Sequence, residues 1–343
     1  DMYLKGMLYG TTVRSPYPHA RILLIDAAAL PDTVTLVTAS DIPGSNELTI
    51  DGESMPILAS ALCRYAGDPV ALLAGPSQRA VVAAARQLTV EYAELPAQLE
   101  PDSSRPKTAV VGQRGNADAG LAKSRQVVQG TYATGIQEHM YNEPQGAVAD
   151  PQESGLAVHC ATQWPYHVRE TVARTLNMRP AACEVTATDT GVDLDGKLWY
   201  PSLVAAHAAL LAQKSRQPVK LVYSNLEDFQ FTSKRAPFSI THLTGLDDSG
   251  AIVAAKVEIT YNAGAYALFT REIVDRLTST GLGLYSCPDL TVTVRGFQTN
   301  LPPLNVLSGF GTAATYFAME THASRIAELA HSDPRGWRRQ PEP

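Results

Sequence analysis

Short apolar runs separated by turn residues dominate the first hundred positions of the chain. Runs rich in β-branched or aliphatic residues predict strands, and they occur at 22–25, 34–37, 70–74 and 88–92. Between the last two runs, small apolar residues recur with helical spacing, and Ser77 is suited to cap a helix over 77–87. Strand, helix and strand in this order predict a β–α–β unit.

The rest of the chain alternates longer helices with strands. A helix is predicted to open at Pro201–Ser202, and an apolar stripe predicts another over 316–330, stopped by Asp333–Pro334. Strands are predicted at 219–223 and at 252–261, the latter after a turn at 247–250. Helices and strands mixed in this way predict an α+β fold.

A polar stretch separates these two parts of the chain. Residues 101–118 contain Pro, Gly, Ser and Asn and show no sustained apolar periodicity. A length of 343 residues favours two domains over one. We therefore expect a first domain at 1–105, a linker at 106–120 and a second domain at 121–343.

The composition narrows the class of protein. Hydrophobic residues make up 45% of the chain and charged residues 18%, which is typical of a folded globular protein. The net charge of −6 argues against a basic groove for nucleic acid or an anionic membrane surface. No run of about 18 apolar residues is present, so no bilayer-spanning helix is expected.

The four cysteines are far apart in the sequence and none forms a C-x-x-C pair. Zinc ribbons and iron–sulfur clusters need closely spaced thiolates, so we expect neither in this chain. Free thiols are typical of the reducing cytosol, which favours a cytoplasmic protein. The first residues resemble neither a signal peptide nor an ordinary initiation site, so we expect the chain to be part of something longer.

One segment, 137–145, is unusually dense in polar and titratable side chains. It reads Q-E-H-M-Y-N-E-P-Q. His139 with Glu138 or Glu143 could bind a metal, but the spacing differs from the H-E-x-x-H pattern of zinc peptidases. A polar strand and turn without a metal is the other interpretation, and the residues alone leave both open.

A second segment, 309–314, fits the G-x-G-x-x-A dinucleotide fingerprint. That motif needs a strand that runs directly into the loop, whereas two prolines precede it here at 302 and 303. We therefore do not expect a nicotinamide cofactor, although glycines would still permit close approach to an anionic ligand.

Hydrolytic chemistry finds little support in the sequence. No G-x-S-x-G elbow occurs, and the eight histidines are dispersed. His207 lies on the apolar face of its helix and is expected to be a hydrogen-bonded core residue. A Ser-His-Asp triad assembled from distant positions stays open, but nothing favours one.

The order of several elements resembles a known family. Similar stretches include Leu8–Ile22, Thr38–Asn46, Tyr65–Ala71 and Val90–Pro96, followed by the Q-x-H-x-Y-x-E-x-Q element at 137–145 and A-T-Q-W-P at 161–165. Over essentially its whole length the chain resembles the molybdenum-cofactor-binding subunit of the xanthine dehydrogenase/aldehyde oxidase family of molybdenum hydroxylases. The resemblance implies an α/β hammerhead domain followed by a first molybdopterin-binding-type α+β domain.

The resemblance also implies which residues face the molybdenum–molybdopterin cofactor. Gln163 matches the glutamine that hydrogen-bonds an oxo ligand of molybdenum in the family. Gly191 and Gly196 match the ends of its G-G-G-F-G-G-K loop, and Gly309, Phe310 and Gly311 match its G-F-G element. The family's catalytic glutamate lies in the second half of the subunit, so the resemblance implies no catalytic residue and no protein ligand to the metal here.

Two departures from the family concern the loop and the substrate positions. The loop reads G-V-D-L-D-G-K, which places carboxylates at 193 and 195 where the family has glycine. Carboxylates would repel an anionic cofactor, so this loop is poorly suited to bind one in the usual way. Leu198 and Ser308 stand where xanthine-type members have a glutamate and an arginine, which argues against purine recognition by that arrangement.

We therefore expect half of a xanthine dehydrogenase-like subunit that hydroxylates an N-heterocycle or aldehyde with oxygen from water. It would be inactive alone, and the missing C-terminal half or a second molybdopterin subunit would complete it. Iron–sulfur clusters and FAD would sit on other subunits, and the substrate would be a small molecule. An exposed apolar face is expected near Gln163 and Gly309. The alternative is a diverged, non-catalytic assembly or binding subunit that no longer holds the cofactor.

Overall fold

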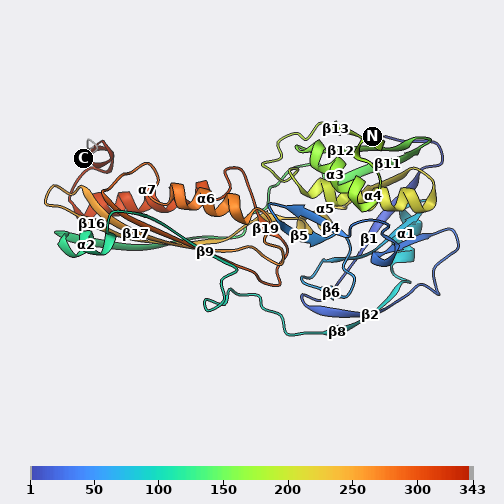
Figure 1. Cartoon of the computed structure of the whole chain (residues 1–343), viewed down its shortest axis with the longest axis horizontal. Helices are drawn as coiled ribbons and strands as arrows, with labels where there is room; N and C mark the ends of the chain where they lie inside the picture. Colours follow the sequence, from blue (N-terminus) through green and yellow to red (C-terminus); the bar gives the residue numbers. More distant parts are fainter. Residues whose placement is uncertain (1, 340–343) are drawn as a thin grey trace. The chain divides into compact units, whose positions relative to one another are not determined.

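The computed structural model describes residues 2–339, and the chain passes several times between two compact units (Figure 1). Unit 1 comprises the residues up to Leu99, Glu138–Lys234 and Asn300–Pro303, and unit 2 comprises Glu100–Gln137, Arg235–Thr299 and the residues from Leu304 onward. Both units mix helices with sheets, so the predicted α+β class is confirmed.

A seven-stranded sheet forms the centre of unit 1, with the strand order β13-β12-β11-β14-β1-β7-β3. Helix α4 packs against β11 and against helix α3 (Figure 1). Because α4 is apolar on all sides, it is buried along almost its whole length. The bounds are β1 Leu8–Arg14, β3 Thr35–Thr38, β7 Pro69–Gly75, β11 Gly146–Gln152, β12 Gly155–Ala161, α3 Pro165–Thr175, β13 Cys183–Thr188, α4 Tyr200–Ser215 and β14 Val219–Val222.

Smaller elements complete unit 1. A three-stranded sheet has the order β6-β2-β8, and β4 pairs with β5. The bounds are β2 Ala20–Asp26, η1 Ala39–Asp41, β4 Glu47–Ile50, β5 Glu53–Pro56, β6 Leu62–Cys63, α1 Gln78–Ala85, β8 Thr89–Glu94, η2 Pro180–Ala182 and α5 Asn225–Phe231.

The predicted strands and helix of the first hundred residues are confirmed, but the β–α–β unit is wrong. The Ser77 hydroxyl accepts a hydrogen bond from the Ala80 amide at 3.2 Å and caps α1 as expected. However, β7 lies in the seven-stranded sheet, whereas β8 pairs with β2 in the small sheet. The reason is that β7 is apolar and buried throughout, while β8 alternates in polarity and suits a sheet with one solvated face.

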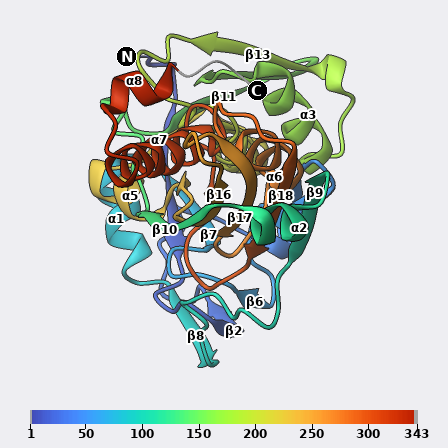
Figure 2. The same cartoon turned by 90° about the vertical axis from the view of Figure 1, so that its left-hand side faces the viewer.

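A five-stranded sheet, ordered β10-β16-β17-β18-β9, forms unit 2. Strands β17 and β18 are parallel and helix α6 connects them, so the crossover unit lies here. Helices α6 and α7 cover one face, and α2 lies on the other (Figure 2). The bounds are β9 Thr108–Arg114, α2 Ala117–Lys123, β10 Gln126–Thr134, β16 Phe238–Leu246, β17 Ile252–Asn262, α6 Thr270–Thr280, β18 Asp289–Phe297, α7 Thr312–Leu329 and α8 Pro334–Arg338. Two-residue strands, β15 Lys234–Arg235 and β19 Leu304–Asn305, lie where the chain passes between the units.

The stretch at 106–120, expected to be a linker, contains regular structure. Strand β9 pairs with β18 at the edge of the sheet, and Asn116 caps α2 by accepting a hydrogen bond from the Ala119 amide at 3.0 Å. Strand β9 was not predicted because its few β-branched residues are surrounded by Pro, Gly and Ser, which are typical of turns. Likewise Asp333–Pro334, expected only to stop a helix, also begins α8, because Asp333 accepts a hydrogen bond from the Gly336 amide.

Two further expectations concern cysteines and membranes. All four cysteines are buried and free. No helix within residues 2–339 combines the length and apolar character needed to span a bilayer.

Candidate functional site

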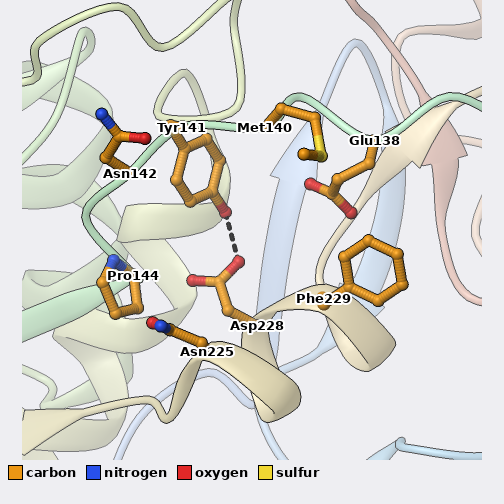
Figure 3. A pocket seen from close by; sticks show the side chains of 8 residues that line it. All are labelled: Glu138, Met140, Tyr141, Asn142, Pro144, Asn225, Asp228 and Phe229. Atoms are coloured by element: carbon orange, nitrogen blue, oxygen red, sulfur yellow. Dashed lines mark hydrogen bonds between the residues drawn. The ribbon is translucent and has the colours of Figure 1, made fainter.

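Segment 138–145 and helix α5 enclose a pocket of about 270 Å³ in unit 1 (Figure 3). Segment 138–145 lines one side of the pocket and helix α5 lines the opposite side. The lining residues are Glu138, Met140, Tyr141, Asn142, Pro144, Asn225, Asp228 and Phe229. The 137–145 segment is not a strand: within it only Gln137 forms a bridge, to Arg235, and the remaining residues are irregular.

Asp228 is the most connected polar side chain of this pocket. It is buried, and it accepts hydrogen bonds from the Tyr141 hydroxyl at 2.6 Å and from the Gln145 amide nitrogen (Figure 3). The Gln145 side chain in turn donates to the Tyr141 hydroxyl at 2.9 Å. Burial raises the pKa of Tyr141, and the Asp228 charge raises it further. Tyr141 is therefore a fixed hydrogen-bond donor at neutral pH.

The second carboxylate of the pocket, Glu138, is neutralised by a lysine. Lys234 Nζ lies 2.7 Å from Glu138 Oε2 and donates to the Thr232 hydroxyl at 2.8 Å. Burial lowers the pKa of Lys234, and the hydrogen bond to Glu138 opposes that shift. Glu138 is thus ion-paired and Asp228 is hydrogen-bonded within the protein, so neither carboxylate is a free base.

Helix α5 is held in place by its cap and by an ion pair. Ser224 caps it by accepting from the Glu227 amide at 3.1 Å, and the Glu227 carboxylate lies 2.9 Å from the Arg14 guanidinium. Burial raises the pKa of Glu227, whereas Arg14 lowers it. The pair therefore anchors the helix that carries Asp228.

A metal site in this region finds no support. His139 is buried, with Nδ1 4.0 Å from Glu138 Oε1. Within the described residues 2–339, no group of three or more His, Cys, Asp or Glu side chains is placed to hold a metal ion.

The structure brings Gln163 together with the loop at 191–197. The Gln163 backbone amide donates to the Lys197 carbonyl at 2.9 Å, and its side-chain Nε2 donates to Asp195 Oδ1 at 3.2 Å. Gln163 lies between β12 and α3 and is exposed. Leu198 is half-buried directly after the loop, and its amide donates to the Asp195 carbonyl at 3.2 Å.

The two ends of this loop differ. At Gly196, a Cβ atom would lie 2.3 Å from the Tyr141 ring, so only glycine fits without rearrangement. The Gly196 carbonyl accepts a hydrogen bond from the Gln145 side chain at 2.8 Å. At Gly191, with φ of 63°, no atom would lie within 4 Å of a Cβ. The pocket segment therefore fixes one end of the loop and leaves the other in the open.

Lys197, just after Gly196, is fully buried. Its Nζ donates to the Pro144 carbonyl at 3.0 Å and lies 4.6 Å from the centroid of the Tyr141 ring. Burial lowers its pKa, while Asp228 and Glu143 raise it. The sequence marked this lysine only as the end of a motif. The density of polar residues at 137–145 was the available signal that it would be buried against them.

The other candidate loop lies in unit 2. Gly309 and Gly311 both have positive φ, at 91° and 93°, and Gly311 forms the N-cap of α7. Phe310 packs edge-to-face on Phe269, and Ser308 is exposed. Only the two-residue β19 precedes this loop, several residues upstream, so the strand that a dinucleotide fold requires does not feed it.

Several apolar side chains of unit 1 are exposed near the loop and the pocket. Val192 and Leu194 of the loop are exposed, as are Met140 and Phe229 at the pocket. His207, in contrast, is buried and its Nε2 is hydrogen-bonded to the Ile57 carbonyl, as expected for a core residue.

What sequence reasoning missed is the contact between 137–145 and α5. Both segments were noted as parts of the family resemblance, but nothing local indicated that Tyr141 and Asp228, 87 residues apart, would share a hydrogen bond. The acidic pair Glu227–Asp228, in the first turn after the Ser224 cap, was the available signal that α5 carries charge.

Comparisons with known proteins agree with this architecture along the whole chain. Residues 1–96 match the model described as aldehyde oxidase and xanthine dehydrogenase, a/b hammerhead domain. Residues 101–340 match the model described as molybdopterin cofactor-binding domain.

Several individual proteins are similar to the chain. A probable xanthine dehydrogenase subunit of Bacillus subtilis (strain 168) is 32% identical over 99% of this chain and 48% of its own length. The nicotinate dehydrogenase large molybdopterin subunit of Eubacterium barkeri is 30% identical over 97% of this chain and 82% of its own length. Quinoline 2-oxidoreductase from Pseudomonas putida 86 superposes with a TM-score of 0.89 at 25% identity, covering 99% of this chain and 47% of that one.

The chain thus spans about half the length of the Bacillus protein and of the quinoline enzyme chain. The matches extend over both units and include a relative that is covered over most of its length. The chain belongs to the xanthine dehydrogenase/aldehyde oxidase family of molybdopterin-binding oxidoreductases.

Proposed function

We propose that this chain supplies the first part of the molybdopterin-binding subunit of a molybdenum hydroxylase. In this proposal Gln163, Gly191 and Gly196 in unit 1, with the 309–311 loop in unit 2, face the cofactor. The observation that carries the proposal is the contact between Gln163 and the 191–197 loop, because it joins the two segments that the family resemblance assigns to the cofactor.

The residues fit such a cofactor in part. An amide N–H suits a terminal oxo group, since that group only accepts hydrogen bonds. Gly196 lies where no side chain fits, and Gly309 and Gly311 have the positive φ that lets backbone approach a ligand. The Gln163 side-chain amide, however, already donates a hydrogen bond to the Asp195 carboxylate. Because this carboxylate would repel an anionic pterin, the loop in this conformation does not fit one.

Activity would require more than these residues. When bound, a molybdenum centre supplies the two-electron oxidant for hydroxylating an electron-poor carbon of an N-heterocycle or aldehyde. We propose that the rest of the subunit, or a second molybdopterin subunit, supplies the catalytic base. Partner subunits with iron–sulfur clusters and FAD would carry the electrons away in the cytoplasm. The domain limits at 1–105 and 121–343 belong to the same proposal.

The residues at the two substrate positions, 198 and 308, differ from those expected for purine recognition. Leu198 is half-buried and cannot donate or accept through its side chain, and Ser308 is exposed and short. A purine edge that needs an acid and a guanidinium would be left unpaired there. A less polar heterocycle or an aldehyde is therefore the proposed substrate class.

The test is molybdenum and pterin content of the complex isolated with its partner subunits, followed by hydroxylation assays. We expect partial occupancy by molybdenum and pterin, above about a tenth of an equivalent, with turnover of quinoline or an aromatic aldehyde and no turnover by this chain alone. Gln163→Ala should lower the metal content, whereas Gln152→Ala, an exposed glutamine at the end of β11, should not. Hydroxylation by the isolated chain would contradict the proposal.

A second candidate is a non-catalytic assembly subunit that has lost the cofactor. The carboxylates at 193 and 195 favour it specifically. Molybdenum below about a tenth of an equivalent in every preparation, with the complex intact, would support this alternative.

A further inference from the structure

The Gln163 side chain is already bonded within the chain. Its Nε2 donates to Asp195 Oδ1 at 3.2 Å, and its backbone amide donates to the Lys197 carbonyl at 2.9 Å. Because a carboxylate only accepts hydrogen bonds, Asp195 orients the Gln163 side chain with its NH₂ group toward the loop. Gln163 is thus tied to the 191–197 loop at two points, and one of them is a side-chain contact exposed to solvent.

The part of the loop that carries Asp195 has fewer buried contacts than the end at 196–197. Gly196 is fixed by the Tyr141 ring and by the Gln145 side chain. Val192 is 79% exposed, and nothing crowds Gly191. A segment with few buried contacts opens at low free energy, so residues 191–195 can open about the fixed end at 196–197.

The closed form of the loop is strained and depends on a few hydrogen bonds. Leu194 has φ of 48°, a region that disfavours its side chain, whereas Asp195, at 70°, belongs to a residue type that tolerates this region. Within the loop, the Asp195 amide donates to Asp193 Oδ1 at 3.2 Å, and the Gly196 and Leu198 amides donate to the Asp193 and Asp195 carbonyls at 2.8 and 3.2 Å. The contact between Asp195 and Gln163 joins residues 191–195 to the segment directly before α3.

We infer that Asp195 is a latch that holds the loop closed over Gln163 and keeps oxo-bearing anions away from its amide. An anion bound to the same amide would lie beside the Asp195 carboxylate, where like charges repel. The loop must therefore open before Gln163 can bind such a ligand. Asp195 acts through Gln163, so it is a positioning residue. This inference rests on the proposed function for the identity of the anion, the oxo-bearing and phosphate-bearing molybdopterin.

The latch itself is tested without cofactor, by backbone hydrogen exchange at 192–195 in the full chain. Gln163→Ala should speed exchange about threefold to tenfold, the range expected for one lost hydrogen bond. In an Asp195→Gly background the same substitution should have no further effect, because its partner is gone. Equal acceleration in both backgrounds, or none in the wild type, would overturn the latch. Circular dichroism and the exchange of α4 amides report whether each variant is folded.

Loading is tested by molybdenum and pterin content per chain in the complex with partner subunits. Asp195→Asn and Asp195→Gly should each raise the content several-fold over wild type. Asp193→Asn removes the same charge from the same loop without touching Gln163, and it should change the content less than twofold. Equal gains from the 193 and 195 variants, or a fully loaded wild type, would overturn the latch. If no variant holds molybdenum, the proposed function fails, while the exchange experiment still decides whether the latch exists.

Discussion

Both glycine-containing loops have residues with positive φ, but different interactions hold the two loops in place. At 191–197, Leu194 and Asp195 take positive φ with side chains that point into solvent or to Gln163. At 308–311, Gly309 and Gly311 take positive φ, and a Cβ on Gly311 would lie 2.9 Å from Leu277. The first loop is held by polar contacts and the second by packing.

The difference shows that positive φ alone does not demand glycine. Where the loop lies in the open, other residues are tolerated at a modest cost, and the chain has used that freedom to introduce carboxylates. Where a neighbouring side chain fills the space of a Cβ, glycine cannot be replaced without a shift in packing. The conformation of the second loop should therefore depend on packing against α6 and β16, and that of the first loop on polar side-chain contacts.

Acid should have the largest effect, and it should act on the second loop through α7. His322 on α7 stacks on His242 of β16 with centroids 5.1 Å apart. Burial, together with the Arg325 charge, lowers the pKa of His322 to about 4, and burial, together with His322, lowers the pKa of His242 to about 3. The unfolded chain binds protons below about pH 6.5 and the folded one does not, so stability is full above pH 6.5 and falls as the pH drops. We expect a loss of about 2 kcal/mol per histidine between pH 7 and pH 5.

Hydrogen exchange at 309–316, measured against pH, checks this expectation locally. His242→Phe keeps a ring in the stack and removes no hydrogen bond, because neither ring nitrogen of His242 has a partner among residues 2–339. It should remove about half of the pH dependence. An unchanged slope would show that the histidine pair does not titrate on unfolding. His207 in unit 1 also has a lowered pKa, of about 3, and serves as the control. Replacing His207 should leave the pH dependence of exchange at 309–316 unchanged.

Within the first loop, Gly196→Ala should destabilise far more than Gly191→Ala. The new Cβ at 196 would lie 2.3 Å from the Tyr141 ring, and the ring is held by its bond to Asp228. We expect a loss of about 3 kcal/mol at 196, and about 1 kcal/mol at 191 from the positive φ alone. Urea denaturation of the full chain measures the free energy of unfolding of both variants. Similar losses would mean that the 196 end of the loop is not fixed.

In the second loop, Gly311→Ala should cost more than Gly309→Ala. Both residues have positive φ, but only at 311 does the Cβ meet Leu277 and Phe238, at 2.9 and 3.1 Å. We expect about 2 kcal/mol at 311 and about 1 kcal/mol at 309 from denaturation curves. A larger loss at 309 would indicate that an unrecognised contact, rather than packing on α6, holds this loop.

Local signals allowed much of the fold to be predicted, and non-local contacts account for what was missed. The Ser77 cap and the opening of α4 at Pro201–Ser202 follow from neighbouring residues alone. The assignment of β7 and β8 to different sheets depends on partners distant in sequence, which no local pattern specifies. The family resemblance located Gln163, but the Asp195 contact arises from a position where the family pattern has no side chain.

The smallest expected effect is the sharpest test of the comparison, because the same change should have opposite signs in the two loops. Leu194 has φ of 48° and an exposed side chain, so Leu194→Gly should relieve strain and raise stability by about 0.5 kcal/mol. Phe310 has φ of 52° but packs on Phe269, and the Arg276 guanidinium lies 5.7 Å from its ring centroid. Phe310→Gly should lower stability by about 1 kcal/mol, because lost aromatic packing outweighs the relieved strain. Matched denaturation curves for the two variants decide the point: a loss in both would mean that the 191–197 loop is held by apolar packing after all.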